Sequence, residues 1–252
     1  MANLIDYENL HKVYNSGKDK VVALEEVSFS VAEAEFVTVV GRSGCGKSTL
    51  LKITAGLLSS TAGSVRVAGA PVLGPLTNIG IVFQSPVLLA WRRALDNVLL
   101  QIESRKLNVE HYREKALQLL ELSGLKGFEY KYPNELSGGM QQRVSISRAL
   151  IHDPPLLLMD EPFGALDAIT RDEMNIELLR IWHGAKKTVL FITHSIPEAV
   201  FLGDRVVVMT PRPGKVAEII NIDLPRPRTT TIRDETQFTS YVKQIRKSLG
   251  VL

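Results

Sequence analysis

The stretch that decides the fold is Gly41-Arg42-Ser43-Gly44-Cys45-Gly46-Lys47-Ser48-Thr49, which fits the spacing G-x-x-x-x-G-K-[ST]. The apolar run before it, Phe36–Val40, predicts a short buried strand, and the residues after it predict a helix that ends near Gly56. A glycine-rich turn between strand and helix lets consecutive backbone N–H groups point inward, where the helix N-terminus adds partial positive charge. This context favours a phosphate-binding loop over a glycine turn that ends in Lys-Ser by accident.

Two side chains of this loop have the chemistry of a nucleotide site. The ammonium group of Lys47 can reach the β- and γ-phosphates, and the hydroxyl of Ser48 can bind Mg²⁺. We therefore expect a nucleotide and Mg²⁺ to bind here.

Composition limits the function classes. The chain has 252 residues and is 45% hydrophobic, enough for one large domain or a domain with an inserted lobe. Its 30 basic and 27 acidic residues give a formal charge of +3, which is too small to favour nucleic acid. The single cysteine, Cys45, fits a reducing compartment. The N-terminus lacks a signal-peptide pattern, and runs such as Leu156–Met159 are too short to cross a bilayer, so we expect a cytosolic protein.

The chain is rich in strands up to about Gln84. Apolar and alternating runs predict strands at Val27–Val31, Val65–Val67 and Ile79–Phe83. A polar loop is expected from Tyr14 to Lys20. From residue 91 to 150 apolar residues recur at three and four positions, which predicts a helical lobe whose last helix is Met140–Leu150.

Strands and helices alternate again after residue 155. Buried strands are predicted at Leu156–Asp160, Thr188–Thr193 and Arg205–Thr210, with a helix over Arg171–His183 and a capping box at Ser195–Glu198. The segment from residue 211 predicts a strand at 216–222 and a last helix at 238–249. This order predicts an α/β fold with a mostly parallel sheet.

Two acidic residues end the apolar run of the first of these strands. In phosphate-loop ATPases a strand-end carboxylate holds Mg²⁺, which assigns that role to Asp160. The next carboxylate, Glu161, is placed to orient or deprotonate an attacking water.

A second anion site is predicted at Leu136-Ser137-Gly138-Gly139-Met140-Gln141-Gln142-Arg143. Ser137 can cap the following helix, and the two glycines leave backbone N–H groups uncovered.

Together these motifs make the chain resemble the ATP-binding subunits of ABC transporters. Gly41–Thr49 matches their Walker A loop, Leu136–Gln141 their signature motif and Leu157–Pro162 their Walker B motif. The remaining matches are Gln84 for the Q-loop, Ala165-Leu166-Asp167 for the D-loop, His194 for the switch histidine and Tyr14 for an aromatic residue stacked on adenine.

The resemblance implies a P-loop NTPase core with a mostly parallel sheet, an antiparallel β edge and an inserted helical lobe. It implies one ATPase domain over residues 1–252, with a nucleotide-binding core at 1–85 and 155–225. The helical lobe with the signature motif would span 86–154, and a C-terminal tail 226–252.

The resemblance also implies a mechanism in which two copies pair head to tail around ATP. Lys47, Ser48 and Thr49 would bind phosphates, while Ser48, Gln84 and Asp160 would hold Mg²⁺. Glu161 would activate water and His194 would hold the γ-phosphate. The other residues implied in nucleotide binding are Tyr14, Gly41, Ser43, Gly44, Cys45, Gly46, Ser137, Gly138, Gly139, Gln141 and Asp167.

The segments 85–98, 210–215 and 223–227 are similar to those of importers for nitrate, sulfonates and taurine. Membrane permease subunits and, indirectly, a solute-binding protein are the implied partners, with the chain on the cytoplasmic side of the membrane. A non-transport ABC ATPase acting on ribosomes or DNA is the alternative, and a nucleotide kinase or GTPase is a more distant one. Ala34, Ala90 and Ser147 depart from the family pattern, where glycine, proline and alanine are usual.

Overall fold

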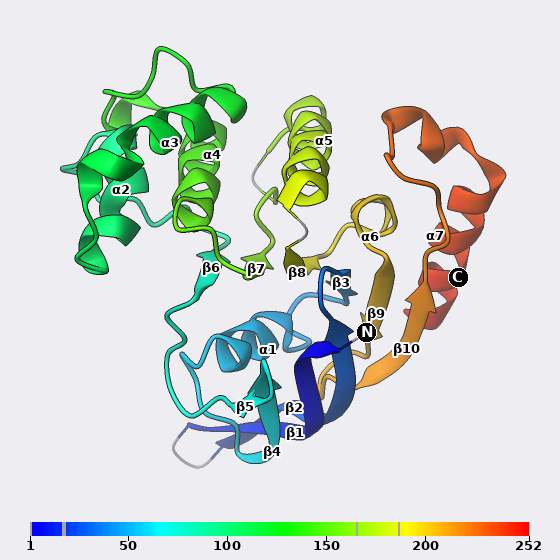
Figure 1. Ribbon diagram of the computed structural model, residues 1–252. Helices are drawn as coiled ribbons and strands as arrows, with labels where there is room; N and C mark the ends of the chain where they lie inside the picture. The colour runs from blue at the N-terminus through cyan, green and yellow to red at the C-terminus, as the bar shows by residue number, and fades with distance from the viewer. Residues whose placement is uncertain (1, 17–18, 165, 186, 252) are drawn as a thin grey trace.

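The strand before the glycine loop, β3 (Phe36–Val40), lies inside a six-stranded sheet. The computed structural model describes residues 2–16, 19–164, 166–185 and 187–251 (Figure 1). Every neighbouring pair in the sheet is parallel except β10–β9 at one edge. The predicted mostly parallel sheet is therefore confirmed. Across the sheet the strands run in the order β10 (Val216–Asn221), β9 (Arg205–Met209), β3, β8 (Thr188–Thr193), β7 (Leu156–Asp160) and β6 (Ile79–Val82).

The central strands are buried on both faces, as their unbroken apolar runs require. Because successive side chains of a strand point to opposite faces, Phe36 and Val40 enter one core while Val37 and Val39 enter another. Helices α5 (Ala168–Ala185), α6 (Ile196–Leu202) and α7 (Thr236–Ser248) supply the first core. The glycine-loop helix α1 (Lys47–Thr54) packs into the second. The result is a layered α/β core (Figure 1).

A second, antiparallel sheet covers α1 from the other side. Its strands run in the order β2 (Asp19–Ala32), β1 (Asn3–Ser16), β4 (Ala62–Val67) and β5 (Ala70–Pro71). The predicted polar loop from Tyr14 to Lys20 is wrong for its flanks, because Tyr14 lies on β1 and pairs with Val21 on β2. The outer ends of β1 and β2 carry exposed side chains, so no buried face revealed these strands in the sequence. Residues 17 and 18 lie outside the described ranges.

The predicted helical lobe is confirmed and lies beside the sheet edge formed by β6 (Figure 1). It contains α2 (Ala94–Ser104), α3 (Val109–Leu122), the short η1 (Pro133–Glu135) and α4 (Gly138–Leu150). The lobe has its own apolar core, which includes Leu95, Leu120 and Val144. Helix α4 begins two residues before the predicted Met140 because the Ser137 hydroxyl accepts a hydrogen bond from the Met140 N–H at 3.2 Å.

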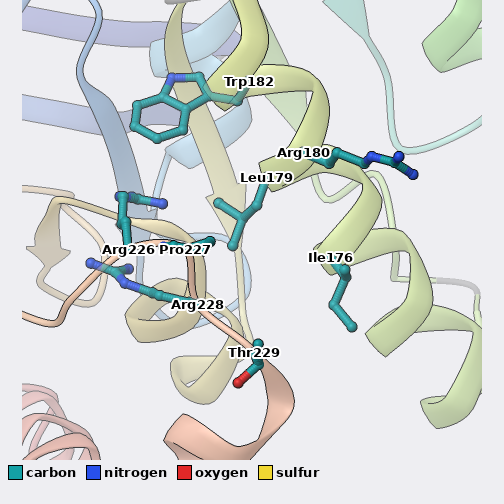
Figure 2. A pocket seen from close by; sticks show the side chains of 8 residues that line it. All are labelled: Ile176, Leu179, Arg180, Trp182, Arg226, Pro227, Arg228 and Thr229. Carbon is teal, nitrogen blue, oxygen red and sulfur yellow. The ribbon is translucent and has the colours of Figure 1, made fainter.

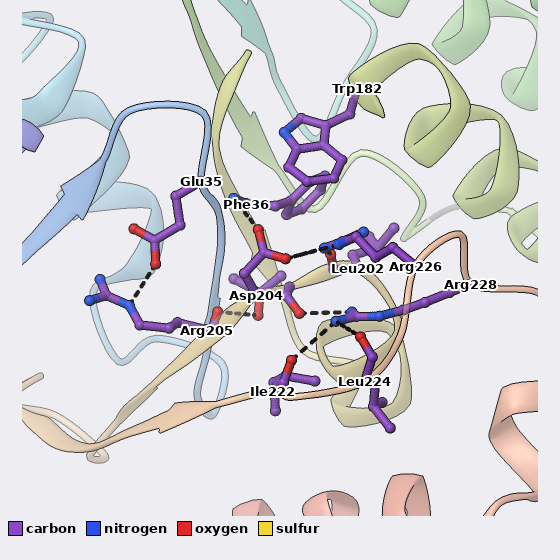
Figure 3. Close-up of polar contacts among 12 residues, drawn as sticks. Glu35, Phe36, Trp182, Leu202, Asp204, Arg205, Ile222, Leu224, Arg226 and Arg228 are labelled. Carbon is purple, nitrogen blue, oxygen red and sulfur yellow. Dashed lines mark hydrogen bonds and ion pairs between the residues drawn. The ribbon is translucent and has the colours of Figure 1, made fainter. Parts of the chain in front are cut away.

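The C-terminal segment folds back onto the parallel sheet through η2 (Thr230–Asp234) and α7. Two arginines hold it there (Figure 3). Arg226 pairs with Asp204 at 2.6 Å and lies 4.3 Å over the ring of Trp182, while Asp204 also accepts from the Phe36 N–H at 2.9 Å. The segment thus connects to the first residue of β3.

Arg228 closes the end of α6. Its buried guanidinium donates to the carbonyls of Val200, Phe201 and Gly203 at 3.0, 2.9 and 2.8 Å. The last carbonyls of a helix have no partner within the helix, so a cation placed there satisfies them and complements the helix dipole. It also donates to Ile222 of the segment after β10 at 3.3 Å (Figure 3).

Two local features differ from the sequence-based expectation. The capping box at Ser195–Glu198 is only half formed: the Ser195 hydroxyl accepts from the Glu198 N–H, but Glu198 bonds to the Thr193 hydroxyl instead. The Ser195 N–H donates to the same Thr193 hydroxyl, which takes the position the glutamate would occupy. Ala34, where the family commonly has glycine, has φ of 59°, in the left-handed region that favours glycine.

We predict that Arg228→Leu lowers the free energy of unfolding by about 3 kcal/mol, because the buried helix-end carbonyls lose their charged donor. Urea unfolding followed by circular dichroism measures this. Arg246→Leu on the exposed face of α7 is the control and leaves stability nearly unchanged. Equal stability of the two variants contradicts the role of Arg228 at the end of α6.

Candidate functional site

The glycine loop has the backbone of an anion cradle. Gly44 and Gly46 have φ of 77° and 101°, backbone angles that residues with a Cβ rarely adopt. A Cβ on Gly46 would also lie 2.7 Å from the Ala23 carbonyl oxygen, whereas a Cβ on Gly44 would meet nothing within 4 Å. Gly46 precedes the first residue of α1, so the uncovered N–H groups of the helix start face the loop.

Lys47 spans the loop from its base. Its ammonium group donates to the carbonyls of Gly41 at 2.9 Å and Arg42 at 3.3 Å, and its side chain is 5% exposed. The same nitrogen lies 3.6 Å from Glu161 Oε1 at the end of β7. Lys47 therefore places a positive charge between the loop and the neighbouring strand end.

The side chains of Ser48 and Asp160 place two oxygen atoms that could bind a metal ion next to each other. The Ser48 hydroxyl donates to Asp160 Oδ1 at 3.0 Å. Burial raises the pKa of Asp160, and the nearby Glu161 charge adds to this, while the Ser48 hydrogen bond opposes it. A partly desolvated carboxylate beside a hydroxyl suits a hard cation such as Mg²⁺. Among the described residues no group of three or more His, Cys, Asp or Glu side chains that could hold a metal ion is found.

Glu161 lies between two basic groups. Its Oε2 is 2.8 Å from His194 Nδ1, which donates when the carboxylate is ionised. Its backbone has φ of 45°, and its N–H donates to the Ile192 carbonyl at 2.9 Å. A positive φ at a non-glycine residue costs conformational free energy, which the surrounding contacts of Glu161 must offset.

These groups surround one cavity of about 360 Å³. The predicted residues that line it are Tyr14, Ser43, Gly44, Gly46, Lys47, Ser48, Thr49, Gln84 and Glu161. Tyr14 enters from β1, and its hydroxyl lies 3.2 Å from the Thr49 hydroxyl. Asp160 and His194 adjoin the cavity through their bonds to Ser48 and Glu161.

Two predicted loop residues do not line the cavity with side chains. Gly41 contributes its carbonyl to Lys47. Cys45 is 1% exposed and packs into the core below the loop, where burial raises the pKa of its thiol.

Three lining residues were not predicted as site residues: Val21, Ala23 and Arg212. Val21 and Ala23 lie on the first half of β2, which the sequence did not predict as a strand. Arg212 follows β9, a strand that the sequence did predict, and sites collect at the carboxyl ends of parallel strands, but only the structure shows that β9 pairs with β3.

The predicted signature residues Ser137 and Gly139 line a different cavity, of about 450 Å³, whereas Gly138 and Gln141 are not among its lining residues. Ser137, Gly139 and Asp167 are among its walls. Asp167 accepts from the Thr170 N–H at 3.0 Å, which caps α5 and lowers the pKa of Asp167. Gln141 donates to the carbonyls of Pro133 at 2.9 Å and Leu136 at 3.2 Å, so its side chain holds the loop before α4. Ala165 lies outside the described residues.

The P-loop residues and the signature residues thus line two separate cavities. The P-loop cavity contains the cationic and carboxylate groups, whereas the signature cavity presents the N-terminus of α4.

A third cavity, of about 290 Å³, lies between α5 and residues 226–229 (Figure 2). Leu179, Trp182 and Pro227 give it mainly apolar walls. The guanidinium of Arg226 is already paired with Asp204, and that of Arg228 with the carbonyls that end α6. Both guanidinium groups thus serve to hold the C-terminal segment in place. Within the described ranges no helix is long and apolar enough to cross a membrane.

Comparison with known proteins identifies this architecture. Residues 24–164 match the family model described as ABC transporter. The chain is 46% identical to the taurine import ATP-binding protein TauB of Rhizobium johnstonii, over 91% of this chain and 89% of that protein. It is 44% identical to the nitrate import ATP-binding protein NrtD of Synechococcus elongatus, over 90% and 84%. A dimeric ATP-binding cassette in a post-hydrolysis state, bound to ADP and Pi, superimposes with a TM-score of 0.80 at 33% identity, covering 88% of this chain and all of that one.

We predict that Gly46→Ala weakens nucleotide binding by about 100-fold, whereas Gly44→Ala weakens it by about 10-fold or less. Both substitutions strain a left-handed residue, but only the first also forces a methyl group against the Ala23 carbonyl. Titration with a fluorescent ATP analogue measures the two dissociation constants. Equal losses would show that backbone strain alone, and not the contact with β2, sets the requirement for glycine.

Proposed function

Because this chain belongs to the ABC transporter family of ATP-binding proteins, we propose that it is the ATP-hydrolysing subunit of an importer for a small solute, nitrate-like or sulfonate-like. The observation that carries the proposal is that the P-loop residues and the signature residues line separate cavities. Two copies arranged head to tail would enclose ATP between the P-loop of one and the α4 N-terminus of the other. The dimeric cassette similar to this chain supports that arrangement.

Each residue near the P-loop then has a defined task. Lys47 and the loop N–H groups bind the β- and γ-phosphates, and Ser48 and Asp160 hold Mg²⁺, which neutralises phosphate charge when bound. Glu161 accepts the proton of the attacking water, and His194 orients that carboxylate and contacts the γ-phosphate. Ser137 and Gly139 of the partner copy complete the phosphate shell.

Gln84 links this chemistry to the helical lobe. It lines the P-loop cavity, and the residues beside it are fixed to α4: Gln142 donates to the Phe83 carbonyl at 3.1 Å. Arg148 donates to the carbonyls of Pro86 and Val87, both at 2.8 Å. A shift of Gln84 on nucleotide exchange would therefore move α4 and the signature residues with it. We treat residues 1–85 and 155–225 as the core, 86–154 as the lobe and 226–252 as the tail.

The segment that follows Gln84 also borders a groove of about 510 Å³ between β6 and α2. Ile81, Leu89 and Leu100 line this groove. We propose it as the contact with a membrane permease, which would hold the chain at the cytoplasmic face of the membrane. ATP then favours the closed pair and ADP the open one, and this difference in affinity drives the permease.

The proposal is tested by purifying the tagged protein from detergent-solubilised host membranes and assaying its ATPase activity with candidate solute-binding proteins. Co-purification of an integral membrane protein, and stimulation of hydrolysis by one loaded binding protein, are the expected results. Recovery of ribosomal or nucleic-acid partners alone would overturn import in favour of the non-transport alternative.

We predict that Glu161→Gln lowers ATP hydrolysis by about 100-fold or more, because the amide cannot accept the proton of water. ATP binding is retained, and the variant forms an ATP-dependent dimer on size-exclusion chromatography. Glu110→Gln, an exposed change at the start of α3, is the control for lost charge. Near-normal turnover of the Glu161 variant would exclude this residue as the base.

We predict that His194→Ala lowers the ATPase rate constant by about 10-fold or more while the dissociation constant of ATP changes little, because Glu161 loses the partner that orients it. Steady-state kinetics and equilibrium binding separate the two quantities. A variant that loses affinity but keeps its rate constant would contradict the assigned role.

A further inference from the structure

Arg212 lines the P-loop cavity from a loop that no sequence motif assigned to nucleotide binding. We infer that Arg212 binds the nucleoside half of ATP, with its planar guanidinium covering a face of the base. The inference rests on the proposed function of that cavity and adds a residue to it. Three observations carry it: the shape of the loop, its attachment and its unpaired charge.

The loop is a closed turn after β9. The Thr210 N–H donates to the Lys215 carbonyl at 2.9 Å, and the Thr210 hydroxyl donates to the Pro213 carbonyl at 2.8 Å. The Lys215 N–H donates back to the same hydroxyl at 2.9 Å. These bonds fix both ends of the turn and leave the exposed Arg212 at its tip, so the backbone from which its side chain extends has a defined position.

Gly214 attaches the turn to the wall of the cavity. Its N–H donates to the Ala23 carbonyl at 3.0 Å, and its carbonyl accepts from the Glu25 N–H at 3.0 Å. A Cβ on Gly214 would lie 2.0 Å from the Cys45 carbonyl oxygen, so only glycine allows the turn to approach the phosphate loop this closely.

This attachment places Arg212 at the nucleoside end of the cavity. Lys47, Ser48 and Glu161 mark the phosphate end, whereas Ala23 belongs to β2 near Val21, which pairs with Tyr14. Gly214 forms a parallel bridge with Leu24, so the residues before Gly214, Arg212 among them, run beside the residues before Leu24, which are on the side of Val21. Arg212 therefore joins Tyr14, Val21 and Ala23 in the part of the cavity that remains for the base.

The charge of Arg212 is available to a ligand. Within the described part of the chain no carboxylate lies within 4.0 Å of its guanidinium, although Lys215 of the same turn pairs with Glu25 at 3.2 Å. A guanidinium lies flat on aromatic rings and is attracted by their π-electrons, which matches a purine next to the Tyr14 ring.

The test compares Arg212→Ala and Arg212→Lys with Lys215→Ala, a change of equal charge in the same turn that faces Glu25. Isothermal titration gives the dissociation constants of ATP, ADP and inorganic triphosphate in the presence of Mg²⁺. We expect Arg212→Ala to weaken ATP and ADP about three- to tenfold and to leave triphosphate unchanged. Arg212→Lys should resemble the alanine variant, because lysine keeps the charge but not the plane.

Other outcomes overturn the inference. Weaker triphosphate binding, or full rescue by lysine, would assign Arg212 to the phosphates instead of the base. Equal losses in Lys215→Ala would show a general effect of charge or of turn stability. If Arg212→Ala binds ATP with normal affinity, the role of Arg212 is rejected while the proposed function of the cavity stands. If the unaltered protein does not bind ATP at all, the proposed function of the cavity itself is rejected.

Discussion

The register of three neighbouring parallel strands is the constraint on which the site depends. Val40 of β3 is opposite Thr193 of β8, and Asp160 of β7 is opposite Ile192 of the same strand. Because the three strands end together, the residues that follow them meet at one edge of the sheet. This brings the glycine loop, the carboxylates and His194 together, although Ser48 and Asp160 are 112 positions apart along the chain, and Glu161 and His194 are 33 apart. A slip of one residue in β7 would move the side chain of Asp160 to the opposite face of the sheet, away from Ser48.

The charged groups at this edge of the sheet also hold one another in position. Lys47 is nearly buried and is compensated by two carbonyls and by Glu161, so the cation and the carboxylate hold each other in place before any phosphate arrives. Binding of phosphate would draw the Lys47 ammonium toward the new anion. Glu161 would then keep its hydrogen bond to His194 and be free to bind a water molecule. The site therefore does not need to reorganise its backbone to exchange one set of partners for the other.

The sequence predicted the elements whose side chains are buried on both faces. The bounds of β7 and β8 agree residue for residue with the predicted strands. Asp160 is the last residue of β7, and Glu161 and His194 directly follow β7 and β8. The sequence-based prediction failed for residues whose place in the site depends on contacts with distant segments and not on the local pattern. Tyr14 lies on a strand whose exposed end has no apolar period, so the pattern indicated a loop. Arg212 sits between prolines in a turn that looks like a plain connection, and only the approach of Gly214 to the phosphate loop gives it a place in the site. Contacts of this kind depend on the packing of distant segments, and the sequence does not encode them locally.

Helix α6 shows how the C-terminal segment, far from the phosphates in sequence, affects the site. Its first turn is capped by Ser195, which follows His194 directly, and its last carbonyls are held by Arg228. With both ends satisfied, the short helix cannot fray at either end without losing a buried hydrogen bond. The backbone that presents His194 to Glu161 is therefore fixed from two directions, by β8 before it and by the arginine-bound helix after it. A segment that contributes no side chain to the P-loop cavity thus stabilises the geometry of the group that orients Glu161.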